Sequence, residues 1–253
     1  MKFGNCLFCK TKFKKRYVEK KFCSLLCANR YNLNGLNKVT LPKKNADLAE
    51  FIGIILGDGH VTKYYAAVTL NTITDKEYIK YVAQLAIKLF QGAPVTIIQH
   101  KNQNATRIQI SSKMVAQFLK NEGMISYKKI MPHWIIKKNV YKLACLRGLV
   151  DTEGSISYKI YQSRKGPRIY KQLNFRNYDL NLMIFVKQTL EQLGLNPTAT
   201  FKKSLYLSNH DAIDKYRECI GFANDKLLQR SFVVDNNSYQ KWRGTEAAIT
   251  GRS

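Results

Sequence analysis

The sequence has 253 residues and is 45% hydrophobic, enough for one large globular domain or two ordinary ones with an added small module. Lysine and arginine number 42 against 17 acidic residues, and the net charge of +25 predicts a polyanionic partner. No apolar run reaches the roughly 18 residues of a membrane span, and the first residues lack the core of a secretory signal. We therefore expect an intracellular protein that binds nucleic acid and no membrane, in the cytoplasm, nucleoid or organelle matrix where the host DNA lies.

Four cysteines near the N-terminus form two close pairs. Cys6 and Cys9 are separated by two residues, Cys23 and Cys27 are separated by three, and 13 residues lie between the pairs. Thiolates at this spacing can hold a tetrahedral zinc ion, whereas disulfide bonds would require an oxidising compartment. We predict a module over residues 1–34 in which these four cysteines bind a structural Zn²⁺ ion.

The same N-terminal stretch is the most basic part of the chain. Residues 1–44 contain 12 lysines or arginines and one acidic residue, Glu19, with aromatic residues between them. This pattern suggests contacts with phosphate groups, and the alternative is that zinc only folds a segment too short for its own core. Residues 35–46 are interpreted as a basic linker.

Two short segments further along the chain share one pattern. Residues 51–59, FIGIILGDG, are an apolar run that ends in Asp58 and a glycine, and residues 146–154, LRGLVDTEG, end in Glu153 and a glycine. One isolated copy could be a core helix with a glycine stop. Two copies, with their acidic residues 95 positions apart, indicate a duplicated functional element.

Small residues recur at helical spacing inside both segments. Gly53 and Gly57 are four residues apart, as are Gly148 and Thr152, so each pair lies on one helical face and permits close helix approach. Two such helices packed together would bring two carboxylates to one place, which is a plausible seat for hard divalent cations. In a very basic protein this arrangement favours metal-assisted phosphodiester chemistry.

These segments resemble the paired signature helices of the LAGLIDADG homing endonucleases, in the form that keeps two copies in one chain. The resemblance covers roughly residues 47–235. The first copy departs from the family pattern at Leu56, where an acidic residue is common, whereas the second copy keeps Asp151. That position is not the one usually assigned to the metal, and glutamate at 153 is a variation that the pattern allows.

The residues between the two copies predict four strands and two helices. Alternation predicts a hairpin over 61–71, and helical periodicity predicts a helix over 75–90. Residues 94–99 and 106–110 read as a second hairpin, followed by a helix over 112–121 that ends before a glycine. With the motif helix in front, the order is αββαββα.

The second half repeats this order. We expect a longer hairpin over 156–175, a helix over 179–193, strands near 198–207 and a helix over 211–219. Periodicity alone predicts only a duplicated α+β protein. The resemblance implies the homing-endonuclease fold, with two curved sheets around a pseudo-twofold axis.

The flanking sequence repeats as well, because residues 107–119 align with 204–216 at an offset of 97. We assign residues 47–141 to the first half and 142–235 to the second. The tail, 236–253, receives no assignment.

Basic residues on the predicted hairpins are candidates for DNA contact, since a two-stranded ribbon fits the major groove. In the first half these are Lys63, Lys101 and Arg107. The hairpin of the second half carries six basic residues and no acid, namely Lys159, Arg164, Lys165, Arg168, Lys171 and Arg176. The alternative is an ordinary solvated charged hairpin.

The resemblance implies hydrolysis of both DNA strands across the minor groove. Asp58 and Glu153, with the backbone carbonyls of Gly57 and Thr152, would hold catalytic Mg²⁺ ions, and one carboxylate per half would let a monomer cut an asymmetric site. The family also uses a basic or amide side chain near each scissile phosphate, for which the candidates are Arg107, Gln109 and Lys203.

Two other functions fit the same fold: an intron RNA maturase and a non-cleaving DNA-binding regulator. The basic surface does not distinguish RNA from DNA. Both acidic positions are intact, which favours the nuclease, because a pure binder has no chemical need for them. A free-standing, intron-encoded or independently mobile enzyme is expected.

Overall fold

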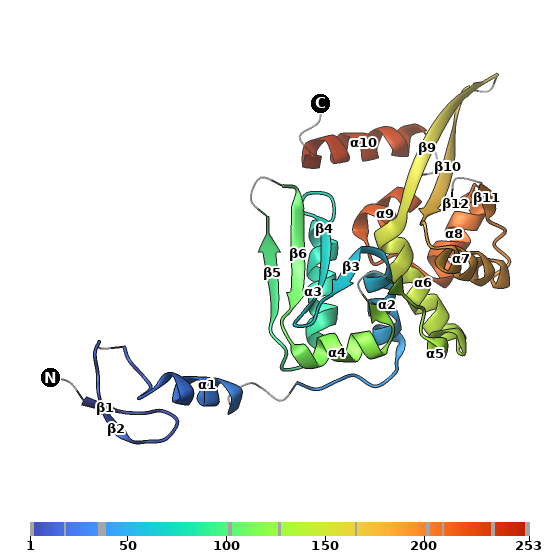
Figure 1. Ribbon diagram of the computed structural model, residues 1–253. Coiled ribbons are helices and arrows are strands. Elements are labelled where there is room, and N and C mark those ends of the chain that lie inside the picture. Colours follow the sequence, from blue (N-terminus) through green and yellow to red (C-terminus); the bar gives the residue numbers. More distant parts are fainter. Residues whose placement is uncertain are drawn as a thin grey trace.

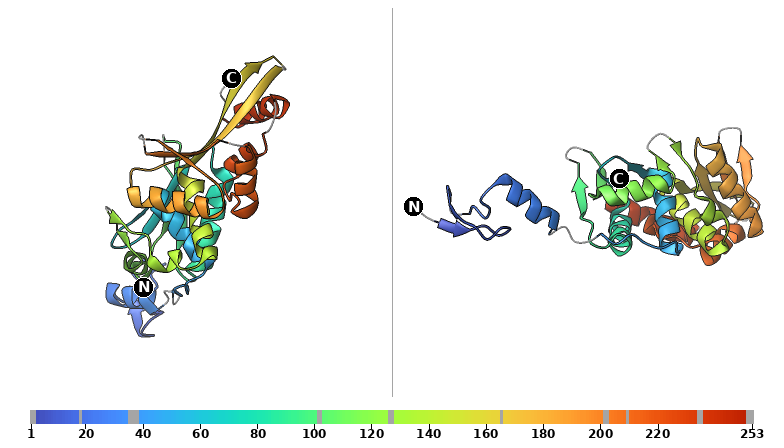
Figure 2. Two further views of the ribbon diagram at one scale, coloured as in Figure 1. Left: turned by 90° about the vertical axis from the view of Figure 1, so that its right-hand side faces the viewer. Right: turned by 60° about the horizontal axis from the view of Figure 1, so that its bottom comes forward.

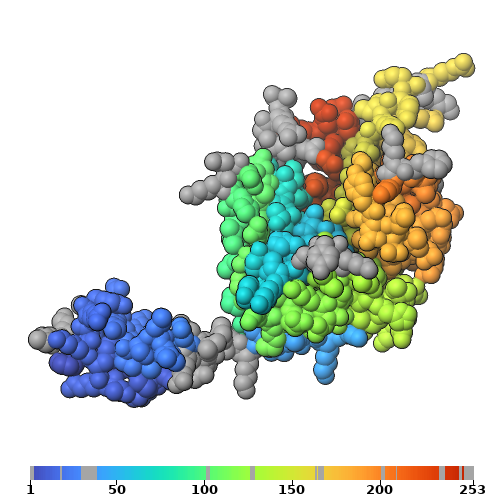
Figure 3. All heavy atoms as spheres, viewed as in Figure 1, coloured from blue at the N-terminus to red at the C-terminus, as the bar shows by residue number. Residues whose placement is uncertain are grey.

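The computed structural model describes residues 3–17, 19–34, 39–100, 103–125, 128–164, 166–200, 203–208, 210–233 and 236–250. At the N-terminus a small hairpin precedes a helix, and these elements form a lobe beside the body of the molecule (Figures 1 and 3). They are β1 (Phe3–Asn5), β2 (Lys12–Lys14) and α1 (Leu25–Asn34).

The first half of the body has the predicted order αββαββα. Its strands pair antiparallel in the order β3-β4-β6-β5. The elements are α2 (Ala46–Asp58), β3 (Gly59–Val61), β4 (Ala66–Asn71), α3 (Lys76–Leu89), β5 (Val95–Gln99), β6 (Ala105–Ile110) and α4 (Lys113–Asn121).

The second half repeats this order and pairs its strands antiparallel in the equivalent order β9-β10-β12-β11. Its elements are α6 (Asn139–Glu153), β9 (Gly154–Ser163), β10 (Gly166–Arg176), α7 (Leu180–Gln192), β11 (Thr198–Thr200), β12 (Ser204–Leu207) and α8 (His210–Cys219). The predicted duplicated α+β fold is therefore confirmed.

Four short elements and one long helix surround the two repeats and are absent from the sequence prediction. They are β7 (Met124–Ile125), β8 (Lys128–Lys129), α5 (His133–Ile136), α9 (Asp225–Ser231) and α10 (Asn236–Thr250). The unassigned tail thus contains a helix. Within the described ranges, no helix combines the length and apolar character that crossing a membrane requires.

The two motif helices touch backbone to backbone. A Cβ atom added at Gly53 would lie 2.2 Å from the carbonyl oxygen of Cys145, and one added at Gly148 would lie 2.2 Å from that of Glu50. Any larger residue at these positions would force α2 and α6 apart. The regular spacing of small residues is therefore what allows this close packing.

An ion pair also crosses this helix pair. Arg147 of α6 donates through its guanidinium to both carboxylate oxygens of Glu50 in α2, and the hydroxyl of Tyr81 donates to the same carboxylate at 2.7 Å. Glu50 is buried, so these donors offset the cost of its charge.

A strand begins immediately after the end of each motif helix. Gly59 and Gly154 follow the acidic residues with extended backbones, at φ values of −93° and −86°. A Cβ atom at Gly154 would lie 2.3 Å from the carbonyl oxygen of Val150, and Gly59 is crowded in the same way. Glycine is needed because the chain folds back across the last helical turn.

The two halves differ most in their first hairpin. In the first half, β3 and β4 have 3 and 6 residues, whereas β9 and β10 have 10 and 11. The longer hairpin projects well beyond the body of the molecule (Figure 2, left).

Candidate functional site

The motif helices meet at their C-terminal ends. Asp58 is the last residue of α2, and Glu153 is the last residue of α6. A Cβ atom at Gly57 would lie 2.1 Å from Oγ1 of Thr152 and 3.2 Å from Cγ of Glu153, so the two ends are in contact. The four residues predicted to bind metal therefore lie at one place, and their role as ligands stays a prediction.

Negative charge accumulates at this meeting point. Asp58 reaches solvent, yet loss of surrounding water, with repulsion from Glu153 and Asp75, raises the pKa of its carboxyl to about 6. Partial burial also raises the pKa of Glu153, and Lys129 opposes that rise. A positive charge between the two carboxylates would relieve this repulsion, which is the electrostatic condition for binding a divalent cation.

Lys129, in the short strand β8, supplies a positive charge beside this point. Its Nζ donates to the carbonyl oxygens of Leu56 and Gly57, each at 3.1 Å. Desolvation lowers the pKa of Lys129, while Glu153 and Asp58 partly offset that effect. Lys129 is a site residue that the sequence prediction misses.

The three candidates for a basic or amide group near the scissile phosphate lie in different surroundings. Arg107 and Gln109 alternate with buried residues of β6 and lie on the less buried face of the first sheet. Desolvation lowers the pKa of His60, and nearby Arg107 and Lys129 lower it further, so these three side chains share one neighbourhood. Lys203 lies in the second half, between β11 and β12.

The exposed face of the second sheet carries several of the basic residues predicted to contact DNA. The strand register puts Lys159, Arg168 and Arg176 on that face, and Arg164 is exposed at the hairpin turn. Lys171 points the other way, is fully buried and donates through Nζ to a backbone carbonyl of α9. Its inclusion in the exposed basic run was wrong, because successive strand residues face opposite sides.

The remaining predicted contacts are in the first half and at the hairpin tip. Lys63 is exposed in the turn between β3 and β4, with its Nζ 5.5 Å from the ring centroid of Tyr64. Lys101 and Lys165 lie outside the residues that the structure describes. Contact with DNA stays a prediction for all of these residues.

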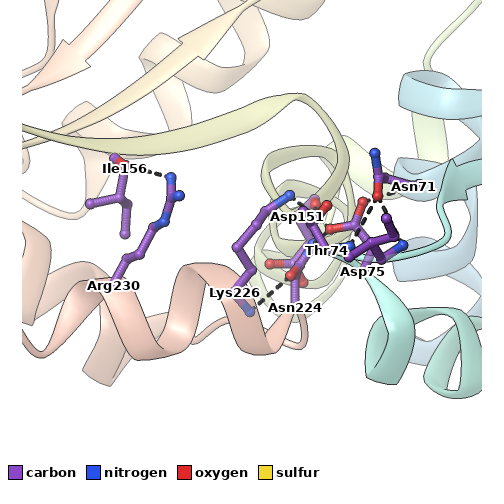
Figure 4. A network of polar contacts seen from close by, with 9 residues as sticks. Asn71, Thr74, Asp75, Asp151, Ile156, Asn224, Lys226 and Arg230 are labelled. Atoms are coloured by element: carbon purple, nitrogen blue, oxygen red, sulfur yellow. Dashed lines mark hydrogen bonds and ion pairs between the residues drawn. The ribbon is translucent and has the colours of Figure 1, made fainter. Parts of the chain in front are cut away.

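A polar network joins the two halves beside the carboxylates (Figure 4). Asp75, at the start of α3, accepts from Nζ of Lys226 at 2.7 Å and from Nδ2 of Asn224 at 3.3 Å. Asn224 also donates to the backbone carbonyl of Asp151 at 3.1 Å. Lys226, like Lys129, is a site residue that the sequence prediction misses, because both lie outside the aligned repeat segments 107–119 and 204–216.

The carboxyl of Asp151 is buried and hydrogen-bonded to the backbone. Its Oδ2 accepts from the backbone N–H of Ala223 at 2.9 Å, and the residue is 3% exposed. Burial raises the pKa of Asp151 to about 8, although the hydrogen bond from Ala223 opposes the rise. The carboxyl therefore fastens the chain before α9 to the motif helix.

The four N-terminal cysteines form a separate cluster. Their sulfur atoms all lie within 4.8 Å of one another, with Cys9 and Cys23 at 3.6 Å and Cys23 and Cys27 at 3.4 Å. Four thiolates around a tetrahedral zinc ion stand about 3.8 Å apart, given zinc–sulfur bonds of about 2.3 Å. This donor set fits zinc.

The relatives found by comparison with known sequences include two distant ones from Methanocaldococcus jannaschii, and no protein-family model matches. The replication factor C small subunit is 26% identical over 234 residues, which cover 79% of this chain and 12% of the relative. An uncharacterized protein is 24% identical over 183 residues, which cover 70% of this chain and 59% of the relative. The chain thus spans about an eighth and about three fifths of the two relatives.

Solved structures with a similar fold include two endonucleases. The homing endonuclease I-DmoI, in complex with DNA and Ca, matches with a TM-score of 0.51 and 18% identity, over 78% of this chain and 97% of that one. A K262A mutant of I-SmaMI matches with a TM-score of 0.50 and 13% identity, over 83% and 93% of the two chains. The mixed α/β fold of this chain is thus the fold of homing endonuclease structures.

Proposed function

We propose that the chain is a LAGLIDADG homing endonuclease that cuts both strands of DNA at a long asymmetric site. The observation that carries this proposal is the contact between two helix ends that each terminate in an acidic residue, Asp58 and Glu153. The fold shared with homing endonuclease structures supports it, as does the net charge of +25.

The residues at the helix ends fit a hard divalent cation. Two carboxylates and nearby backbone carbonyls are oxygen donors of the kind that Mg²⁺ prefers. The ammonium of Lys129 lies beside them, and both carboxylates favour its charge, although desolvation lowers its pKa. When bound, Mg²⁺ would lower the pKa of a water molecule and stabilise the leaving oxygen.

Side chains of the protein would bind the cations and balance the charge of the scissile phosphate. Asp58 and Glu153 would hold the cations, with the carbonyls of Gly57 and Thr152 completing the donor set. Lys129 and Arg107 would face the scissile phosphate and balance its charge. Because each half contributes one carboxylate, a single chain would suffice to cut two strands as a monomer.

DNA would lie across the exposed faces of the two sheets. The alternating strand pattern leaves Lys159, Arg168 and Arg176 on one such face, and Lys63 is exposed in the first half. These residues would hold phosphates and set the register, while uncharged neighbours reach base edges. We expect the protein to act where the host DNA lies, in intron homing.

We also propose that the N-terminal module binds one structural Zn²⁺ ion through its four cysteines. The purified chain is expected to contain about one zinc per molecule, measured by elemental analysis. Cys9→Ser should lower this content, whereas Cys145→Ser, which changes a buried cysteine far from the cluster, should not. A zinc-free native chain that is folded over residues 3–34 would contradict the proposal.

The nuclease proposal is tested by selecting cleaved molecules from a randomised duplex library. The native chain in Mg²⁺ is compared with the native chain in EDTA and with the double variant Asp58→Asn, Glu153→Gln. Recovery of one long asymmetric site only with intact carboxylates and metal is the expected result. Tight binding of DNA or of structured RNA without cutting by any form would instead support a regulator or a maturase.

A further inference from the structure

The C-terminal helix α10 belongs to neither repeat. It runs across the body from beside β9 toward the ends of the first-half strands (Figure 1). The rings of Trp242 and Tyr239 pack against Tyr158 of β9, with centroids 5.2 and 5.4 Å apart, and the guanidinium of Arg230 lies 4.7 Å from the Trp242 ring. This aromatic cluster fixes α10 to the second half.

Between α10, β9 and the first half lies a cleft of about 730 Å³. Its walls include Ser155 and Ser157, which follow Glu153 along β9, and Asn71 at the end of β4. The described lining residues include no acidic side chain and three basic ones, Lys226, Arg230 and Arg243.

Resting on the proposed nuclease function, we propose that this cleft binds the sugar–phosphate backbone of one DNA strand beside the bond that Glu153 serves, with α10 as its cover. The lining chemistry suits this ligand. Lys226 is paired with Asp75 and the guanidinium of Arg230 lies on the Trp242 ring, so the exposed guanidinium of Arg243 is the group that would pair with phosphate oxygens. Serine hydroxyls and asparagine amides add neutral hydrogen bonds to the backbone. Because such contacts do not read bases, the cleft would contribute affinity and register at any sequence.

The size of the cleft indicates one strand rather than a duplex. Its volume falls within the roughly 300–1,000 Å³ that is typical of sites for small ligands, which is room for only a few nucleotide units. Because α10 forms one wall of the cleft, we expect the helix to close over the bound strand. Opening of α10 would therefore govern the release of bound DNA.

Arg243 offers the most direct test, because it lines the cleft from α10. Binding of a fluorescent mixed-sequence duplex is measured over a range of salt concentrations in the double variant Asp58→Asn, Glu153→Gln, which excludes cleavage. Adding Arg243→Ala should weaken binding about five- to twentyfold at low salt and reduce the salt slope by about one. Lys241→Ala is the matched control, because Lys241 is exposed on the same helix and does not line the cleft.

The rate at which bound duplex dissociates from variants that weaken the packing of α10 provides a second, independent test. In the same background, Trp242→Ala should speed dissociation of the bound duplex at least about fivefold, because it removes the ring that holds α10 against β9. Trp242→Phe keeps an aromatic ring and should restore most of the slow dissociation. A circular dichroism melt of each variant checks that the body remains folded.

The outcomes separate this inference from the proposed function. If the parent double variant binds the duplex but Arg243→Ala matches Lys241→Ala, and Trp242→Ala dissociates at the parent rate, the cleft proposal is wrong while the nuclease proposal stands. If the parent binds structured RNA and no duplex, both proposals are wrong.

Discussion

The two halves of the body share one scaffold, but the lysine that each places near the acidic residues makes different contacts. Lys129 of the first half donates to the carbonyls at the end of α2, beside both carboxylates. Lys226, in α9 of the second half, pairs with Asp75 across the boundary between the halves. The first hairpin differs too, since only that of the second half extends beyond the body.

This difference indicates that duplication preserved the helix pair and allowed the surroundings of each acidic residue to diverge. The helix pair tolerates little change because its backbones touch. A side chain at the edge of the helix pair can instead form a different contact with little loss of stability. Two non-equivalent halves are what an enzyme needs to process two strands of an asymmetric site.

The largest expected effect comes from breaking the feature that the halves share. Gly148→Ala should destabilise the fold by about 3 kcal/mol or more, because its Cβ would lie 2.2 Å from the carbonyl oxygen of Glu50. Urea denaturation measures the loss. Gly244→Ala is the matched control, since a Cβ there meets nothing within 4 Å, and it should stabilise α10 by about 0.5–1 kcal/mol. Equal stability of the two variants would contradict the packing account.

The next test compares the two lysines directly. Lys129→Met should slow cleavage of one strand by about 10²-fold or more, because it removes a charge beside the carboxylates. Lys226→Met should affect the other strand, and by less, because Lys226 is already paired with Asp75. Single-turnover assays with each strand labelled in turn resolve the two effects. Identical losses on both strands for both variants would mean that the halves are equivalent.

The pH dependence of cleavage reports on the carboxylate pair. Because the pKa of Asp58 is raised to about 6, this residue is mainly protonated below that pH and cannot bind a cation well. At fixed subsaturating Mg²⁺ the rate should therefore rise with pH through about 6, and added Mg²⁺ should shift this rise to lower pH. A profile that is flat between pH 5 and 7 would contradict the assignment.

Asp151→Asn should have the smallest effect. At pH 7 the buried carboxyl, with a pKa of about 8, is mainly protonated, so an amide replaces it with little change in charge. The pKa of Asp151 is higher in the folded chain than in the unfolded chain, so folding is favoured less as pH rises between these two pKa values. The stability of the native protein should therefore fall with rising pH up to about pH 8. Melting curves of the variant should lack that part of the decline, and its cleavage at pH 7 should stay within about threefold of native.

Much of the body could be predicted because its elements are long and strongly patterned. The helix expected over 75–90 is α3, Lys76–Leu89, and the hairpin expected over 156–175 is β9 with β10. Amphipathic periodicity and strand alternation are local properties of the sequence, so they can be recognised without knowledge of the fold. The pairing of the acidic residues followed from the repeat itself.

The rest depended on contacts between distant segments. Lys129 is one of 42 basic residues, and only the folded chain places it against the end of α2. Lys171 sits in a basic run, yet its strand position turns it into the core. The helix α10 has a polar sequence, and its aromatic residues Tyr239 and Trp242 meet Tyr158 and Arg230 only in the folded chain.

Strand-resolved cleavage of a site recovered by selection tests the central claim most directly. The native chain and the double variant Asp58→Asn, Glu153→Gln are compared at equal bound fraction, with Mg²⁺ and with EDTA. The account predicts that the native chain cuts both strands only with Mg²⁺ and that the double variant binds the site but cuts neither strand. Cleavage by the double variant at the native rate, or by the native chain in EDTA, would show that the helix-end carboxylates are not the catalytic centre.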